Sequence, residues 1–185
     1  MIRTMTYRSA TVVAVLVLAF AAGCGGDDGD DATQEWANSV CTDMGTWVTS
    51  IQATVEGLTA KGLGIQKSDI DAAVAEAKSA TDTLVTGINE LGAPEGEAAQ
   101  QAKSELDELG TQLQTQVANV EQAAASDSGP IQLAQTVGAA VSASAAAAKS
   151  TFEAIQSLDA GDELKSAFED ADACKTLRDQ IADIG

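Results

Sequence analysis

The stretch "WANSVCTDMGTWVTSI", residues 36–51, decides the fold because its large apolar residues recur at helical spacing. The apolar positions, at steps of three and four, are Trp36, Val40, Met44, Trp47 and Ile51. Such a stripe is typical of an amphipathic α-helix that packs against a core. Val55 and Leu58 continue it, and the sequence therefore predicts a first helix over residues 33–58.

The same spacing recurs in four later segments of the chain. They cover residues 68–91 with Ser68 as the cap, residues 95–125, residues 130–158 and residues 162–184. Gly and Pro lie at the joints, and no segment alternates as a β-strand would. The sequence therefore predicts an all-α fold, an antiparallel helical bundle of four to five helices over residues 33–185.

The run "GAAVSASAAAAKS", residues 138–150, consists almost entirely of small residues. A low-complexity linker is one interpretation. Alanine is the best helix former and has little bulk, so we favour a helix that packs very close to a neighbour.

The N-terminus has the features of an export signal. Arg3 and Arg8 precede an apolar run over residues 10–22. That run is shorter than the about 20 residues that span a bilayer, and charge followed by a short apolar run is typical of a secretory signal peptide. An uncleaved membrane anchor is the alternative.

The residues that end this run, Ala21-Ala22-Gly23-Cys24, resemble the lipobox of bacterial lipoproteins, although leucine is usual where Ala21 stands. The resemblance implies a signal peptide over residues 1–23, cleavage before Cys24, and attachment of diacylglycerol to the Cys24 sulfur. The expected location is therefore extracytoplasmic, with the lipid on Cys24 anchoring the chain to the cell membrane. Cleavage would change the net charge from −18 to −20, because it removes two arginines.

A Gly/Asp run follows Cys24, and we expect residues 24–32 to form a flexible acidic tether. Glycine keeps such a segment loose, and like charges extend it. Its aspartates lack the ligand spacing and the terminal Glu of an EF-hand loop, so a calcium site is the less favoured interpretation.

Two cysteines remain once Cys24 carries lipid, and these are Cys41 and Cys174. Thiols in an exported protein usually pair. We therefore predict a disulfide that joins the last helix to the first. A catalytic or metal role would be favoured by a CxxC pair, a histidine or nearby basic residues, and the sequence has neither a CxxC pair nor a histidine.

The composition argues against several kinds of chemistry. The chain has no histidine, which removes the commonest general base and metal ligand. The net charge of −18 argues against nucleic acid as a partner. Carboxylate pairs such as Glu105 with Glu108, and Glu169 with Asp172, are expected to point outward. We predict no enzymatic activity, no metal site and no cofactor.

Two hypotheses about function follow. The first is a helical module that binds an unknown envelope protein or a cell-wall component. The alternative is a carrier or sensor domain that holds a small molecule between its helices. Its candidate ligand contacts are Trp36, Trp47 and Phe152. A closed apolar cavity that touches one of them would favour it, and a solidly packed bundle would contradict it.

The segments "WANSVCTDMGTW", residues 36–47, and "AFEDADACKTL", residues 167–177, together with the lipobox, resemble small secreted lipoproteins of actinobacteria. Those proteins carry an early Trp/Cys helix and a late Cys helix, and most have no assigned activity. The resemblance implies a location and a fold rather than a function.

Overall fold

A computed structural model of the protein describes residues 28–126, 129–158 and 161–182. Within these ranges the chain is helical throughout, without a strand. The helices are α1 (Asp28–Ala60), the short 3₁₀ helix η1 (Gly62–Gly64), α2 (Lys67–Leu91), α3 (Glu97–Ala125), α4 (Pro130–Ser157), α5 (Gly161–Asp170) and α6 (Asp172–Ala182). The all-α helical bundle is confirmed. The predicted signal peptide and Cys24 lie outside the described residues.

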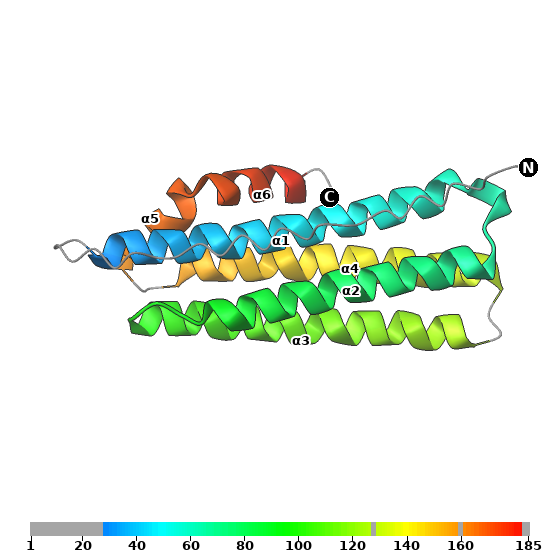
Figure 1. The fold of residues 1–185 in the computed structure, drawn as a ribbon, viewed down its shortest axis with the longest axis horizontal. Helices are drawn as coiled ribbons and strands as arrows, with labels where there is room; N and C mark the ends of the chain where they lie inside the picture. Colours follow the sequence, from blue (N-terminus) through cyan, green and yellow to red (C-terminus); the bar gives the residue numbers. More distant parts are fainter. Residues whose placement is uncertain (1–27, 127–128, 159–160, 183–185) are drawn as a thin grey trace, which may run out of the picture.

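The four long helices run along one another as a bundle, and α5 and α6 lie over α1 (Figure 1). Helix α1 packs on α2, α2 on α3, and α3 on α4, while α1 also contacts α5 and α6. Short connections between long helices give neighbours that run antiparallel. The arrangement is a four-helix bundle with two short helices added to one side.

Helix α1 begins earlier than the sequence analysis expects. Residues 28–32 were assigned to the flexible tether, but they form the first turns of α1. Acidic residues are favourable near a helix N-terminus, where the helix dipole is positive, and this run is rich in aspartate. The Thr33 hydroxyl also donates a hydrogen bond to Glu163 Oε1 at 3.1 Å, which links this end of α1 to α5.

The prediction that Ser68 caps the second helix is wrong. The residue before α2 is Gln66 rather than Ser68, which lies inside the first turn. The Gln66 backbone N–H donates to Asp69 Oδ2 at 3.0 Å, so the carboxylate reaches back to cap the helix start. This backbone hydrogen bond, together with Lys61, holds the pKa of Asp69 below its usual value.

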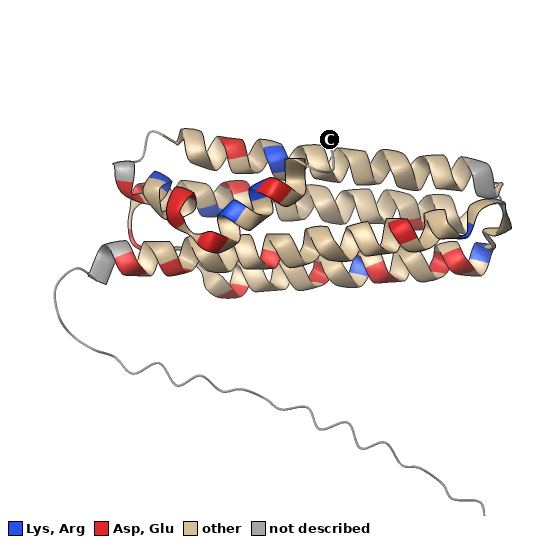
Figure 2. Ribbon diagram, turned by 90° about the horizontal axis from the view of Figure 1, so that it is seen from above, with Lys and Arg blue, Asp and Glu red and all other residues tan. Residues whose placement is uncertain are grey.

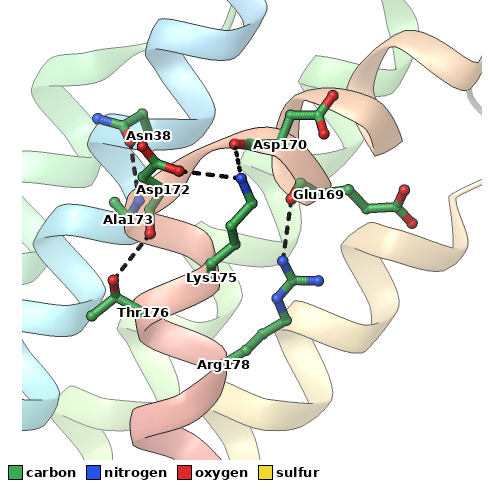
Figure 3. Close-up of polar contacts among 8 residues, drawn as sticks. All are labelled: Asn38, Glu169, Asp170, Asp172, Ala173, Lys175, Thr176 and Arg178. Atoms are coloured by element: carbon green, nitrogen blue, oxygen red, sulfur yellow. Dashed lines mark hydrogen bonds and ion pairs between the residues drawn. The ribbon is translucent and has the colours of Figure 1, made fainter.

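The predicted last helix over residues 162–184 is in fact two helices that meet at Ala171. Ending α5 here leaves backbone carbonyls without their usual helical partners. Lysine and arginine side chains from α6 supply donors (Figure 3). Lys175 Nζ donates to the carbonyl of Asp170 at 2.7 Å, and the Arg178 guanidinium donates to the carbonyl of Glu169 at 3.2 Å. The apolar residues keep their helical spacing across the break, so the sequence pattern does not indicate that α5 ends here.

The start of α6 is fixed to α1 by a disulfide and a hydrogen bond. The sulfur atoms of Cys41 and Cys174 lie 2.00 Å apart and their Cα atoms 4.9 Å apart, at the disulfide distance that the sequence predicts. One turn before Cys41, Asn38 Oδ1 accepts a hydrogen bond from the backbone N–H of Ala173 at 3.3 Å (Figure 3). An otherwise unpaired N–H of the first turn of α6 is thus satisfied from another helix.

The buried apolar residues fall into two clusters rather than one continuous core. The disulfide-end cluster draws on all six α-helices and contains Trp36, Ala37, Val40, Cys41, Met44, Trp47, Val48, Leu84, Ile88, Ala102, Leu106, Leu109, Leu113, Ala148, Phe152, Ile155, Leu164, Ala167, Phe168, Ala171, Cys174 and Leu177. The far-end cluster is much smaller and contains Ile70, Val74, Val120, Ala124 and Leu133. Most inward positions predicted from periodicity belong to one of the two.

Charge is distributed unevenly over the helices. Acidic residues occur along α1, α2 and α3, whereas α4 carries only Lys149 and Glu153 (Figure 2). The exposed surface of α4 is therefore nearly uncharged on a chain whose net charge is −18.

The disulfide is expected to supply a large part of the stability. It closes a loop of 133 positions, which the chain-entropy model values at about 5 kcal/mol. About 1 kcal/mol corresponds to roughly 2–4 °C for a chain of this size. We therefore expect Cys41→Ala/Cys174→Ala, or reduction, to lower the melting temperature by more than about 10 °C.

The measurement is a thermal melt of the exported protein with and without reductant, with mass spectrometry to detect the bond. The double variant should melt identically under both conditions, which controls for effects of the reductant elsewhere. Free thiols at both positions in exported protein, or unchanged melts, would contradict the prediction.

Candidate functional site

An apolar cavity of about 50 Å³ lies where the two core clusters meet. All four long helices line it. The lining residues are Trp47, Ile51, Thr54 and Val55 of α1, Ala73, Val74, Ala77 and Thr81 of α2, Gln116, Val117 and Val120 of α3, and Val137, Ala140, Val141 and Ser144 of α4. Concave, mostly apolar spaces between bundle helices are usual places for small ligands.

The space exists because small side chains occupy inward positions of two helices. On α2 these are Ala77 and Thr81, and on α4 they are Ala140 and Ser144. The small residues of α4 were expected to bring it very close to a neighbour, and α4 does pack along α3. On the side toward α1, however, they leave a void instead of a contact.

One hydrogen bond crosses the cavity wall from α1 to α2. Trp47 Nε1 donates to Thr81 Oγ1 at 3.1 Å, and the two residues are 5% and 1% exposed. A hydroxyl that accepts a hydrogen bond still has an O–H to donate. Thr81 and Ser144, together with Thr54 and Gln116, therefore place polar groups in a wall that is mostly apolar.

Of the three predicted ligand contacts, only Trp47 lines the cavity. Trp36 and Phe152 pack inside the disulfide-end cluster, where both rings meet Phe168 edge-on at centroid distances of 5.7 and 6.1 Å. Trp36 Nε1 donates to the carbonyl of Gly92 at 2.9 Å. These contacts fix Trp36 and Phe152 as parts of the packed core.

A surface groove of about 480 Å³ runs between α1 and α2, on the other side of Trp47 from the cavity. We call it the α1–α2 groove; its polar lining consists of Asp43, Thr46, Ser50, Thr54, Glu76, Ser79 and Thr83. Trp47 and Thr54 line both the groove and the cavity. Thr54 Oγ1 lies 3.5 Å from Glu76 Oε2 across the groove. Polar and apolar spaces are thus adjacent here.

Asp43 is the titratable group in the groove with a shifted pKa. Its carboxylate lies against Gly87, where a Cβ would come 2.5 Å from Oδ2. Partial burial raises the pKa of Asp43 above the ordinary 3.8. Across the described ranges, no lysine or arginine lies within ion-pair distance of this carboxylate. Asp43 is therefore a partly desolvated acid without a cationic partner.

The carboxylates considered earlier for chemistry do not gather into a centre. Glu108, Glu169 and Asp172 are exposed, and Glu105 is half-buried. In the part of the chain that the structure describes, no group of three or more His, Cys, Asp or Glu side chains is placed to hold a metal ion.

The sequence pattern does not predict the groove, but it does contain an indication of the cavity. Ala77 and Thr81 continue the helical spacing of Ile70, Val74 and Leu84, and Ser144 continues that of Val137, Val141 and Ala148. At such inward positions large apolar residues would otherwise fill the core. The groove gave no comparable signal, because its hydroxyl and carboxyl residues have the composition of any solvated helix surface.

No protein-family model, curated protein or solved structure matches the chain. None of the helices within the described ranges combines the length and the apolar character needed to cross a membrane.

The raised pKa of Asp43 predicts a pH-dependent stability difference. Above the raised pKa the folded protein holds a poorly solvated charge that the unfolded chain would solvate, so ionisation opposes folding. Asp43→Asn should therefore be more stable than the wild type at neutral pH. The difference should shrink as the pH falls through the raised pKa, and should vanish below about 3.8.

Urea denaturation of both proteins between pH 3 and 8 measures this difference. Asp179→Asn, an exposed position on α6, removes the same charge elsewhere and serves as the control. A difference between Asp43→Asn and wild type that is the same at every pH would contradict the assigned cause.

Proposed function

We propose that the protein is a lipid-anchored extracytoplasmic helical module that holds a small apolar molecule between its helices. The observation that carries the proposal is the cavity that α1 to α4 line, with Trp47 and Thr81 joined across its wall. Of the two hypotheses drawn from the sequence, this is the alternative. The feature expected for it is a closed apolar cavity; the space beside Trp47 is apolar but small and partly open, and it supports the proposal to that extent.

The size of the cavity bears on how a ligand would enter. Known apolar cavities of about 150 Å³ bind benzene, and typical ligand pockets reach about 300–1,000 Å³. A space of about 50 Å³ must therefore widen to hold more than a few atoms. Helix α4 packs chiefly on α3 and makes few contacts with α1, so separating α1 from α4 would disrupt the least packing.

The proposed location rests on the N-terminal sequence, with Arg3, Arg8, the apolar run and the lipobox that ends in Cys24. The disulfide between Cys41 and Cys174 supports it, since disulfides persist in oxidising compartments. Binding of an envelope protein or a cell-wall component stays a prediction from the sequence, as does the lack of enzymatic activity.

Filling the cavity should abolish ligand binding. Ala140 faces the cavity and its neighbour Ala139 is exposed on the same helix, so Ala140→Leu and Ala139→Leu form a matched pair. We expect 1-decanol to shift the ¹⁹F resonance of fluorotryptophan at Trp47 in the wild type and in Ala139→Leu, but not in Ala140→Leu. The Trp36 resonance, from a ring outside the cavity, is the internal reference.

The proposal fails if 1-decanol leaves the Trp47 resonance of the wild type unchanged. It also fails if Ala140→Leu responds as the wild type does.

Replacement of Cys24 tests the anchor independently of the cavity. Without the Cys24 sulfur no diacylglycerol can be attached, so Cys24→Ala should leave the precursor unprocessed or release the domain from membranes. Fractionation of cells expressing each form, with mass spectrometry of the N-terminus, measures both outcomes. A variant that is processed normally and stays membrane-bound would show that Cys24 is not the anchor.

A further inference from the structure

We infer that the cavity and the α1–α2 groove form one site for a single-chain amphiphile with a primary-amine head group. The aliphatic chain would enter the cavity and the ammonium group would stay in the groove. This inference rests on the proposed function and adds the chemical class of the ligand.

The cavity and the α1–α2 groove share a wall. Trp47 and Thr54 lie seven residues apart on α1, and both line the cavity on one side and the groove on the other. The Trp47 indole is held to α2 by its single hydrogen bond to Thr81 at 3.1 Å. A modest movement of this ring would join an apolar space to a polar one, which is the shape that a chain with a head group needs.

The groove offers hydrogen-bond acceptors and few donors. Within α1, the hydroxyls of Thr46, Ser50 and Thr54 donate to the backbone carbonyls four residues earlier, at 2.9 Å in each case. On α2, the Thr83 hydroxyl does the same at 2.8 Å. These four hydroxyl protons are thereby engaged, and these four oxygens offer lone pairs toward the groove, beside the hydroxyl of Ser79. A head group that donates several hydrogen bonds suits this lining.

The charged side chains that line the groove are all negative. Asp43 and Glu76 line the groove, and none of its lining residues is Lys or Arg. The neighbouring Lys78 is paired with Asp82. Asp43 also lacks a cationic partner among the described residues. A carboxylate head group would meet like charges and find no cation, whereas an ammonium group would pair with one of the two carboxylates. These lie at opposite ends of the groove, about 16 Å apart along α2, because Asp43 contacts Gly87 and Glu76 contacts Thr54. A protonated amine carries three donors and a positive charge, so it matches both properties of the groove.

The test uses three probes with the same chain: decylamine, 1-decanol and decanoate. The full chain, labelled with fluorotryptophan and held in nanodiscs of zwitterionic lipid at pH 7, is titrated with each probe below its micelle concentration. We expect a saturable shift of the Trp47 resonance with decylamine at about tenfold lower concentration than with 1-decanol, and no saturable shift with decanoate. The Trp36 resonance reports any nonspecific effect of probe in the disc lipid.

Charge variants show whether the groove causes the preference. In Asp43→Asn/Glu76→Gln, decylamine should lose its tenfold advantage while 1-decanol still binds. Glu108→Gln, an exposed position on α3, is the control for lowering the negative charge elsewhere and should keep the advantage.

The outcomes separate this inference from the proposed function. If none of the three probes shifts Trp47, both are overturned. If 1-decanol binds but decylamine binds no better, or if the advantage survives in Asp43→Asn/Glu76→Gln, only the amine head group is overturned.

Discussion

The covalent bond between Cys41 and Cys174 is the constraint on which the rest of the arrangement depends. It joins the first helix to the last across 133 positions, and the contacts of α5 and α6 are assembled around it. Asn38 caps α6 from α1, and the Phe168 ring of α5 sits between Trp36 and Phe152. A chain with few aromatic residues and strong self-repulsion gains most from such a bond, because the bond limits expansion of the unfolded state without needing apolar area.

The bond also divides the bundle into unequal halves. The disulfide-end cluster draws on six helices and contains all four aromatic rings of the described chain, whereas the far-end cluster contains five aliphatic side chains from α2, α3 and α4. Local stability follows the amount of apolar area buried, so the far half is expected to open more readily. The cavity lies at the boundary between the halves. The helix backbones on the disulfide side of the cavity are therefore held in place, whereas those of the far half can move apart when a ligand enters.

Much of this fold could be predicted from the sequence, and the failures have identifiable physical causes. Apolar periodicity located the long helices and most of their buried residues, because the core dictates those positions. It could not find the break at Ala171, since the stripe continues from Phe168 to Cys174 and the helix ends are stabilised by Lys175 and Arg178 from the following turns. The sequence indicates the cavity only in part. Thr81 and Ser144 are small polar residues at inward positions, but a small residue can either leave a cavity or let two helices pack closely. Which of these occurs depends on the paths of the helices, and the sequence does not give those.

The charge pattern explains why the α1–α2 groove has no cation among its lining residues. Most lysines in ion pairs bind an acid of their own helix, as in Lys67–Asp71, Lys78–Asp82 and Lys165–Glu169. Helical neighbours at i and i+4 meet at little entropic cost, so these few cations are already engaged near their own positions. Asp43 and Glu76 have no lysine or arginine three or four residues away on α1 or α2, and both carboxylates line the groove.

A diffuse negative field raises the local concentration of cations. The proposed lipid anchor would in turn hold the groove close to a membrane, where single-chain amphiphiles concentrate. Charge and location would thus favour the same class of ligand for independent reasons.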